Sequence, residues 1–466
     1  MSTATVIQAY RFALDPAPAQ ARDLERHAGA ARFAYNWALA QVKANIGQRQ
    51  AERSYGLDGE DLTPALGWNL PALRRAWNQA KHEVAPWWGE CSKEAFNTSL
   101  DGLARGLKNF GDSRSGQRAG KKARFPRFKS RHRATPSVRF TTGVIRVEGD
   151  RKHVTLPRVG RIKTHESTAK LARRLEAGTA RIMSATVRRE GGRWHCSFTA
   201  EVQRAQRTPA RPGERVGVDL GICALAVLST GEPVPNPRHL NMALHKLRAA
   251  SRTLSRRQGP DWRTGRRPSR RWEAARRDVS RLNTRIANQR RDGLHKLTSW
   301  LTVTYGTIVV EDLNVAGMLK NRKLARHLAD AGFGEIRRQL GYKTSWNGGT
   351  LVAASRWFPS SKTCSACGAV KPKLPLRVRT FTCEHCGLAI DRDLNAAINL
   401  VALVSASTTG TGVAGDPEPE GLNGRGADQK TRPGWAGGCE ASTPHHPGGQ
   451  DGDRPLVTVS CETRTH

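Results

Sequence analysis

The sequence is poor in acidic residues. It holds 40 Asp and Glu against 77 Lys and Arg, a formal surplus of 37 positive charges over 466 residues. A compact protein with such a surplus repels itself unless a polyanion neutralises it. An acidic membrane is one such polyanion, but the charge is spread over the whole chain and no lipid-anchoring stretch accompanies it. The composition therefore favours a nucleic acid as the partner.

Long apolar runs are also missing. No stretch of about 18 apolar residues occurs, which excludes a transmembrane helix, and residues 1–10 lack the apolar core of a signal peptide. We therefore expect a cytoplasmic protein with no membrane partner. The length is typical of about three domains.

Cysteine is scarce and unevenly placed. Of nine cysteines, five are scattered, and four form two Cys-x-x-Cys pairs with 15 residues between them: Cys364, Cys367, Cys383 and Cys386. This usage is typical of a metal site in a reducing compartment, not of a disulfide framework. The spacing is that of a zinc ribbon. A closed set of four thiolates predicts one structural Zn²⁺.

Three of the few acids stand at unusual places. Asp219 and Glu311 each follow a short apolar run, and Asp393 opens a helical pattern. Each one alone is more often structural, but as a set they predict a catalytic site that holds two Mg²⁺ ions. Asp312 and Asp391 are neighbouring alternatives. We favour Asp393 over Asp391 because it directly precedes Leu394-Asn395.

The first half of the chain alternates between strands and helices. We expect a strand over residues 5–14, helices over 17–48 and 68–110 with a break at Pro86, and several short strands between 137 and 202. These strands predict a small β-barrel that the first strand rejoins.

Two segments concentrate basic residues. Residues 111–133 hold nine Lys or Arg with Phe125 and Phe128 between them, and residues 251–291 hold 14 Arg against three acids. A disordered linker and a solvated helical arm are the alternatives, but both segments suit a polyanion-facing surface. The candidate nucleic-acid-binding residues are Lys121, Lys122, Arg124, Arg127, Lys129, Arg276 and Arg277.

The second half predicts an α/β domain. Strands are expected over 215–219, 224–229, 307–310 and 350–357, with two long helices in 238–303 and further helices over 320–341 and 393–404. Beyond residue 405 the sequence is rich in Gly, Pro, Asp and Thr without periodicity, which predicts a disordered tail over 405–466.

Four motifs together resemble one family. Val-Gly-Val-Asp-Leu-Gly, Val-Glu-Asp-Leu-Asn-Val, Ser-Ser-Lys-Thr-Cys-Ser-Ala-Cys-Gly and Cys-Glu-His-Cys-Gly-Leu-Ala-Ile-Asp-Arg-Asp-Leu-Asn-Ala-Ala are similar to TnpB, the OrfB protein of bacterial insertion sequences, which is related to compact type V CRISPR effectors. The resemblance covers about residues 1–404. One departure is Phe381, where many relatives have Trp.

The resemblance implies a multidomain α/β architecture. Expected are a wedge β-barrel (1–14 and 120–207) with an inserted helical recognition domain (15–119), a RuvC-like nuclease of RNase H fold (214–357 and 388–404), and a zinc-ribbon, target-strand-loading insertion (358–387). It also implies Asp219, Glu311 and Asp393 as catalytic acids. The expected activity is RNA-guided, Mg²⁺-dependent DNA cleavage by a nucleoid-associated monomer. Its expected partners are a transposon-end guide RNA and double-stranded DNA with a short flanking motif.

Three other functions stay open on sequence grounds. An RNA-guided DNA-binding regulator would not cut, and the intact acids count against it. A strand-transfer transposase would use similar acids. The absence of a His-x-His motif with a later Tyr counts against a tyrosine-type transposase. A zinc-ribbon RNA-binding protein would leave the three acids without a role.

Overall fold

The computed structural model describes residues 3–131, 134–205, 207–261, 263–375 and 377–407. The chain divides into two compact units, Thr3–Arg204 and the segment from Ala205 onward, which are described separately. The predicted tail lies almost wholly outside the described residues. Within the described part, none of the helices combines the length and apolarity needed to cross a lipid bilayer.

The unit Thr3–Arg204 joins three helices to a seven-stranded sheet. Its helices are α1 (Pro18–Ser54), α2 (Leu70–Val84) and α3 (Lys93–Arg114), with the short α4 (Ala169–Glu176) later in the chain. The strands are β1 (Thr3–Asp15), β2 (Ser137–Phe140), β3 (Arg146–Val147), β4 (His153–Leu156), β5 (Gly160–Thr164), β6 (Ala180–Glu190) and β7 (Arg193–Ala205).

The strand order of this sheet is β2-β6-β7-β1-β5-β4-β3, so β1 lies between strands from much later in the sequence. The expectation that the first strand rejoins the later ones is confirmed. Closure into a barrel stays a prediction, because the order ends at β2 and β3 without a pairing between them among the described strands.

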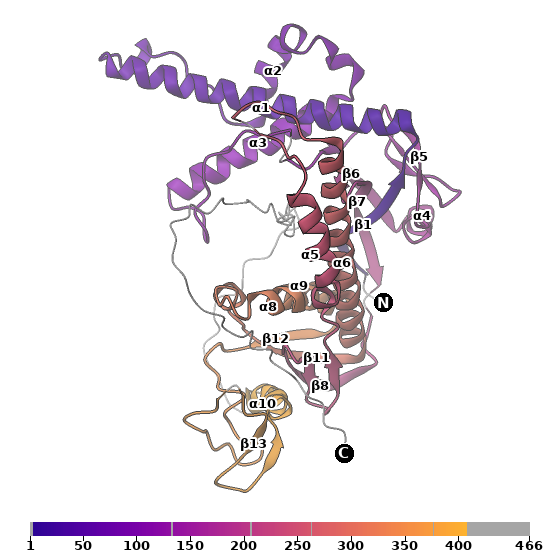
Figure 1. Ribbon diagram of the computed structural model, residues 1–466, viewed down its shortest axis with the longest axis vertical. Coiled ribbons are helices and arrows are strands. Elements are labelled where there is room, and N and C mark those ends of the chain that lie inside the picture. The colour runs from indigo at the N-terminus through magenta and orange to yellow at the C-terminus, as the bar shows by residue number, and fades with distance from the viewer. Residues whose placement is uncertain (1–2, 132–133, 206, 262, 376, 408–466) are drawn as a thin grey trace. The chain divides into compact units, whose positions relative to one another are not determined.

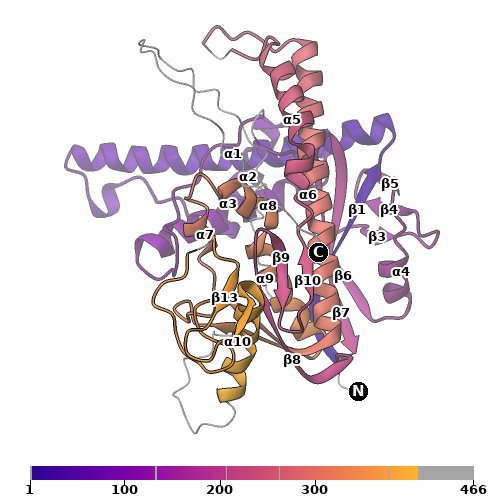
Figure 2. The same ribbon diagram turned by 60° about the horizontal axis from the view of Figure 1, so that its bottom comes forward.

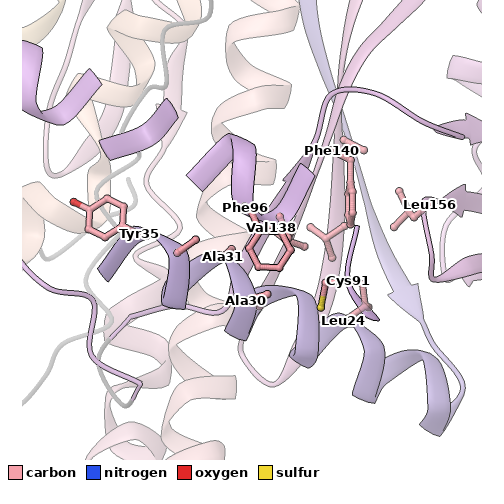
Figure 3. Packing of buried hydrophobic residues seen from close by; sticks show 14 of the residues in the cluster. Leu24, Ala30, Ala31, Tyr35, Cys91, Phe96, Val138, Phe140 and Leu156 are labelled. Atoms are coloured by element: carbon pink, nitrogen blue, oxygen red, sulfur yellow. The ribbon is translucent and has the colours of Figure 1, made fainter. Parts of the chain in front are cut away.

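One apolar core holds this unit together. Leu24, Ala30 and Ala31 of α1 are buried together with Phe96 of α3 and Phe140 of β2 (Figure 3). Small alanines on α1 leave room for the large rings, so helix and sheet approach closely. Burying such side chains is the main stabilising contribution to a fold of this kind.

The second unit is built on a five-stranded sheet with the order β10-β9-β8-β11-β12. Its strands are β8 (Arg211–Asp219), β9 (Ala224–Leu228), β10 (Pro233–Pro235), β11 (Tyr305–Glu311) and β12 (Thr350–Ala354). Strands β8, β11 and β12 are parallel, whereas β9 and β10 run antiparallel to their neighbours. A mixed sheet of this kind confirms the α/β class of the chain.

Helices flank this sheet. The long pair α5 (His239–Ser255) and α6 (Arg270–Thr304) packs side by side (Figure 1), and α9 (Phe333–Trp346) packs against α6. After β12 come the two-stranded sheet of β13 (Thr380–Thr382) and β14 (Ala389–Asp391) and then α10 (Arg392–Ser407), beside β13 in Figure 2.

Two expectations for this unit were wrong in detail. The helix predicted over 320–341 is two pieces, α8 (Ala325–Ala331) and the first part of α9, because Gly332 adopts a left-handed φ of 73° between them. The short α7 (Val315–Met318) precedes the predicted range. The strand predicted over 350–357 ends at Ala354, where its partner β11 ends at Glu311. Trp357 therefore lies in a loop and is 87% exposed.

Candidate active site and metal centre

Asp219 and Glu311 end two adjacent parallel strands. Val218 of β8 pairs with Val310 of β11, so the acid that follows each valine lies at the same sheet edge. The valines are buried, while both acids are only partly buried. The apolar strands thus anchor the backbone and leave the two carboxylates at the carboxyl end of the sheet.

Helix α10 brings the third acid to this edge. It packs on β8, and its first turn contains Asp393. Asp391, the weighed alternative, accepts hydrogen bonds through Oδ1 from the main-chain N–H groups of Asp393 (2.9 Å) and Leu394 (3.0 Å). This oxygen therefore satisfies the helix N-terminus, which is the ordinary role of an acid at that position.

The approach of α10 to β8 depends on Gly217. A Cβ atom at Gly217 would lie 2.0 Å from the carbonyl oxygen of Ala397 and 3.2 Å from Cβ of Leu400. The first contact is with backbone, which cannot rotate away as a flexible side chain can. Only glycine at this strand position lets the helix, and with it Asp393, lie so close to Asp219.

Gly217→Ala is therefore expected to push α10 away from the sheet and to destabilise the protein by about 1–3 kcal/mol. Gly213→Ala is the matched control, since Gly213 lies on the same strand with open space around its Cβ position. Urea unfolding of the two variants measures the difference. Equal stability of both would show that the close contact imposes no constraint.

Glu311 and Asp393 act electrostatically on Asp219. Desolvation is the largest cause that raises the pKa of Asp219, to about 8, and the carboxylates of Glu311 and Asp393 add to it. Desolvation also raises the pKa of Asp393, against the opposing effect of Arg379. Asp219 thus lies in a field that disfavours its own negative charge, as expected where a cation would compensate it.

This raised pKa predicts a pH dependence of stability in metal-free protein. The folded state retains the Asp219 proton up to about pH 8, whereas the unfolded chain releases it near pH 4. The contribution of Asp219 to the free energy of unfolding is therefore fully present below pH 4. It decreases as the pH rises from 4 to 8, by up to about 1.4 kcal/mol per pH unit.

Asp219→Asn should remove this component, so the variant gains stability relative to wild type as the pH rises from 4 to 8. Asp292→Asn, which changes an exposed acid paired with Lys296 on α6, is the control. Unfolding measured at each pH in chelator-treated buffer gives the difference. Parallel curves for wild type and Asp219→Asn would contradict the raised pKa.

Each of the other two acids has a partner from the segment after β12. Ser360 Oγ donates a hydrogen bond to Glu311 Oε1 (2.5 Å), and Arg379 Nη1 lies 3.4 Å from Asp393 Oδ2. Asp312, the other alternative, instead forms ion pairs with Arg337 and Arg356, which lower its pKa. Asp312 is therefore already compensated by the protein itself.

The four predicted cysteines converge. All four Sγ atoms lie within 4.8 Å of one another, with 3.6 Å between Cys364 and Cys386 and 3.6 Å between Cys367 and Cys383. A tetrahedral zinc with Zn–S bonds of about 2.3 Å needs sulfurs roughly 3.8 Å apart. The donor set therefore fits one Zn²⁺. Among the described residues, no other group of three or more His, Cys, Asp or Glu side chains has its ligand atoms this close together. The carboxylates of Asp219, Glu311 and Asp393 are therefore farther apart than the four sulfurs.

Two matching turns shape this cluster. Gly368 N–H donates to Cys364 O (3.0 Å) and Gly387 N–H to Cys383 O (3.1 Å), and both glycines have positive φ, 76° and 75°. Left-handed backbone of this kind is easily adopted only by glycine. Phe381 is fully buried between the two pairs, so the departure from Trp keeps an apolar centre.

The predicted nucleic-acid-binding residues lie at the surface, but two of them also have structural contacts. Arg276 lies over the ring of Trp272, with its guanidinium carbon 5.3 Å from the ring centroid. Lys129 Nζ lies 3.7 Å from the centroid of the Tyr35 ring, and desolvation lowers the pKa of this amine to about 8. The main-chain N–H of Lys129 donates to the Asn36 side-chain oxygen, and the main-chain oxygen of Lys129 accepts from the Asn36 side-chain NH₂. Phe125 packs with Trp68 and Phe110 instead of offering a stacking surface. The others are exposed: Lys121, Lys122, Arg124, Arg127 and Arg277.

Sequence reasoning missed Gly217, Ser360 and Asn399, and also the contact that Arg379 makes with Asp393. Asn399 was detectable, because it repeats Asn395 one helical turn later among buried Ala396, Ala397 and Leu400. Polar residues on a buried helix face require hydrogen-bond partners. No sequence signal marks Ser360.

Known proteins resemble the chain over most of its length. Residues 197–322 match the OrfB family described as "Probable transposase", residues 333–400 match "Cas12f1-like, TNB domain", and residues 1–51 match "Helix-turn-helix domain". In the last range the described residues form one strand and one uninterrupted helix.

Two relatives cover nearly the whole chain. A Mycobacterium tuberculosis H37Rv protein named "Putative RNA-guided DNA endonuclease" is 41% identical over 465 residues, 95% of each chain. Escherichia coli K12 InsQ, named likewise, is 30% identical over 85% of this chain and 92% of its own. A Cas12f1 structure in complex with sgRNA and target DNA aligns with 12% identity, a TM-score of 0.46 and coverage of 85% and 99%. The extent of the two sequence matches shows that the chain belongs to the OrfB/TnpB family of insertion-sequence proteins.

Proposed function

We propose that this protein is a transposon-encoded, RNA-guided DNA endonuclease with a RuvC-like site of RNase H type. The observation that carries the proposal is the meeting of Asp219, Glu311 and Asp393, where two parallel strand ends and a helix start bring three acids together in a basic protein. The names of the relatives supply RNA guidance and DNA as the substrate.

The acids fit Mg²⁺ because carboxylate oxygens are its preferred protein ligands. The raised pKa of Asp219 supports this fit, since its charge lacks a sufficient counter-ion within the protein. We propose that the three acids hold two Mg²⁺. When bound, these ions would supply Lewis-acid polarisation of the scissile phosphodiester and lower the pKa of the attacking water.

The protein's own part is to hold the carboxylates in place. Buried β8 and β11 fix Asp219 and Glu311, and capping by Asp391 fixes the turn that carries Asp393. Arg379 places a positive charge beside Asp393. The same guanidinium group can also bind the negative charge of a DNA phosphate.

The remaining assignments follow from the family. We propose that the unit Thr3–Arg204 contains the wedge and recognition domains, and that its basic segment helps to neutralise RNA or DNA phosphates. Pairing with a guide RNA would supply sequence specificity, while the protein recognises duplex shape and a short flanking DNA motif. We further propose a monomer in which residues 358–387 load the target strand.

Two measurements test the function. Sequencing of the RNA that copurifies with the full chain is expected to give a defined transposon-end RNA, and a plasmid carrying the matching target is expected to be cut in Mg²⁺. Target binding without cutting would instead identify a regulator, and joined DNA products a strand-transfer enzyme. Only random cellular RNA would favour a zinc-ribbon RNA-binding protein.

A further inference from the structure

We infer that Ser360 is a positioning residue for Glu311, and that Asn395 and Asn399 hold it in place together with Cys364 of the zinc site. This inference rests on the proposed function, because it assigns the role of Glu311 as a metal ligand. It adds that the zinc site and the acid site are connected through one buried polar network.

The first link is between Ser360 and Glu311. Ser360 is only 3% exposed, and its hydroxyl donates a hydrogen bond to Glu311 Oε1 at 2.5 Å. Among the described residues, no hydrogen bond involves Glu311 Oε2. One carboxylate oxygen is thus fixed and the other is left for a ligand, which is how an outer residue orients a metal-binding carboxylate.

The second link holds Ser360 itself. Asn399 Nδ2 donates to the main-chain oxygens of Ser360 (2.8 Å) and Thr363 (2.7 Å), and Asn399 is 5% exposed. A buried amide with both donor hydrogens used on one short segment fixes that segment against α10. The same helix carries Asp393, so Ser360 and Asp393 share one rigid support.

The third link reaches the zinc site. Asn395 is fully buried, donates to Thr363 O (2.7 Å) and accepts from Ser365 N–H (3.0 Å). Cys364 lies between these two residues, so Asn395 bonds the main chain on both sides of a zinc ligand. A loss of zinc that loosens Cys364 would therefore also loosen the support of Ser360.

Simple packing is the competing explanation for this network. It predicts that Ser360→Ala lowers stability and changes nothing else. A positioning role predicts a change in metal binding as well, because Glu311 would sample other orientations. Loss of an outer partner of a metal ligand typically weakens metal affinity roughly 10- to 100-fold.

The test uses the full chain with its zinc retained, and Mn²⁺ as the probe of the acid site, followed by electron paramagnetic resonance. Ser360→Ala is expected to bind Mn²⁺ roughly 10- to 100-fold more weakly, and Ser360→Thr, which keeps the hydroxyl, close to wild type. Ser345→Ala is the control, since that exposed hydroxyl bonds only its own helix. Cleavage by Ser360→Ala should recover at high Mg²⁺, which a folding defect would not show.

A double-mutant cycle tests the support from α10. Asn399→Ala should also weaken Mn²⁺ binding, and the double variant should lose less than the product of the two single losses, because both changes act through one contact. If the wild type binds Mn²⁺ and cuts DNA but Ser360→Ala binds Mn²⁺ as tightly as the wild type, the role of Ser360 is overturned and the proposed function is not. A wild type that binds no Mn²⁺ at this site would overturn the proposed function together with it.

Discussion

Asp219→Ala is expected to lower the rate of DNA cleavage at least roughly 10³-fold while guide-RNA and target binding stay within about twofold of wild type. The proposed metal ions contribute several kcal/mol of transition-state stabilisation, and each 1.36 kcal/mol is a tenfold rate change. The carboxylates of Glu311 and Asp393 both raise the pKa of Asp219, so loss of Asp219 should disturb the whole site. Binding should persist because phosphate contacts come from basic side chains elsewhere.

Single-turnover cleavage and a gel-shift assay with the same guide and target measure the two quantities separately. Asp312→Ala is the informative control, since this neighbouring acid is already paired with Arg337 and Arg356. We expect its cleavage to fall much less than that of Asp219→Ala. If Asp219→Ala cut DNA as fast as wild type, the assignment of the acids would be wrong.

The strands that carry two of the acids were predictable because their signal is local. A run such as Ile308–Val310 before Glu311 is a buried strand in almost any context, and the structure places it between β8 and β12 in its sheet. The cysteine pairs were predictable for a similar reason, since their spacing alone permits the turns that gather the sulfurs. Local patterns thus supplied the candidate ligands.

The supports of these ligands were not predictable, because they join residues far apart in the sequence. Gly217 is required by a backbone atom of Ala397, and Ser360 bonds an acid 49 residues away. Neither residue has a periodic neighbourhood that would mark it. The same limit explains the helix predicted over 320–341, where apolar spacing continued but Gly332 ended one helix and began another.

Long-range contacts connect the zinc site and the acid site within the second unit. Helix α10 packs on β8, and its Asn399 donates a hydrogen bond to Ser360 of the segment between β12 and α10. Arg379 of the same segment bonds Cys223 in the loop between β8 and β9. A change at the zinc site should therefore act on the acids although the sulfurs do not touch them. Removal of zinc is the strongest such change.

Cys364→Ser is expected to lower zinc content from about one ion per chain to nearly none, because a closed four-sulfur site that loses a thiolate loses most of its affinity. Structural zinc contributes on the order of 10 kcal/mol to the folding of small domains. The segment between β12 and α10 should then unfold locally. Trypsin should cut it at exposed basic residues, among them Lys373, Arg377 and Arg379.

The unit Thr3–Arg204 should keep its own unfolding transition in this variant, since it forms a separate core. Metal analysis, limited proteolysis and thermal unfolding measure the three effects, and Cys461→Ser is the control because it lies outside the predicted ligand set. DNA cleavage should fall at least roughly 100-fold, since Ser360 and Arg379 both lose their support. Retention of one zinc ion by Cys364→Ser would contradict the four-cysteine site, and zinc loss with unchanged cleavage would show that the acids stand independently of it.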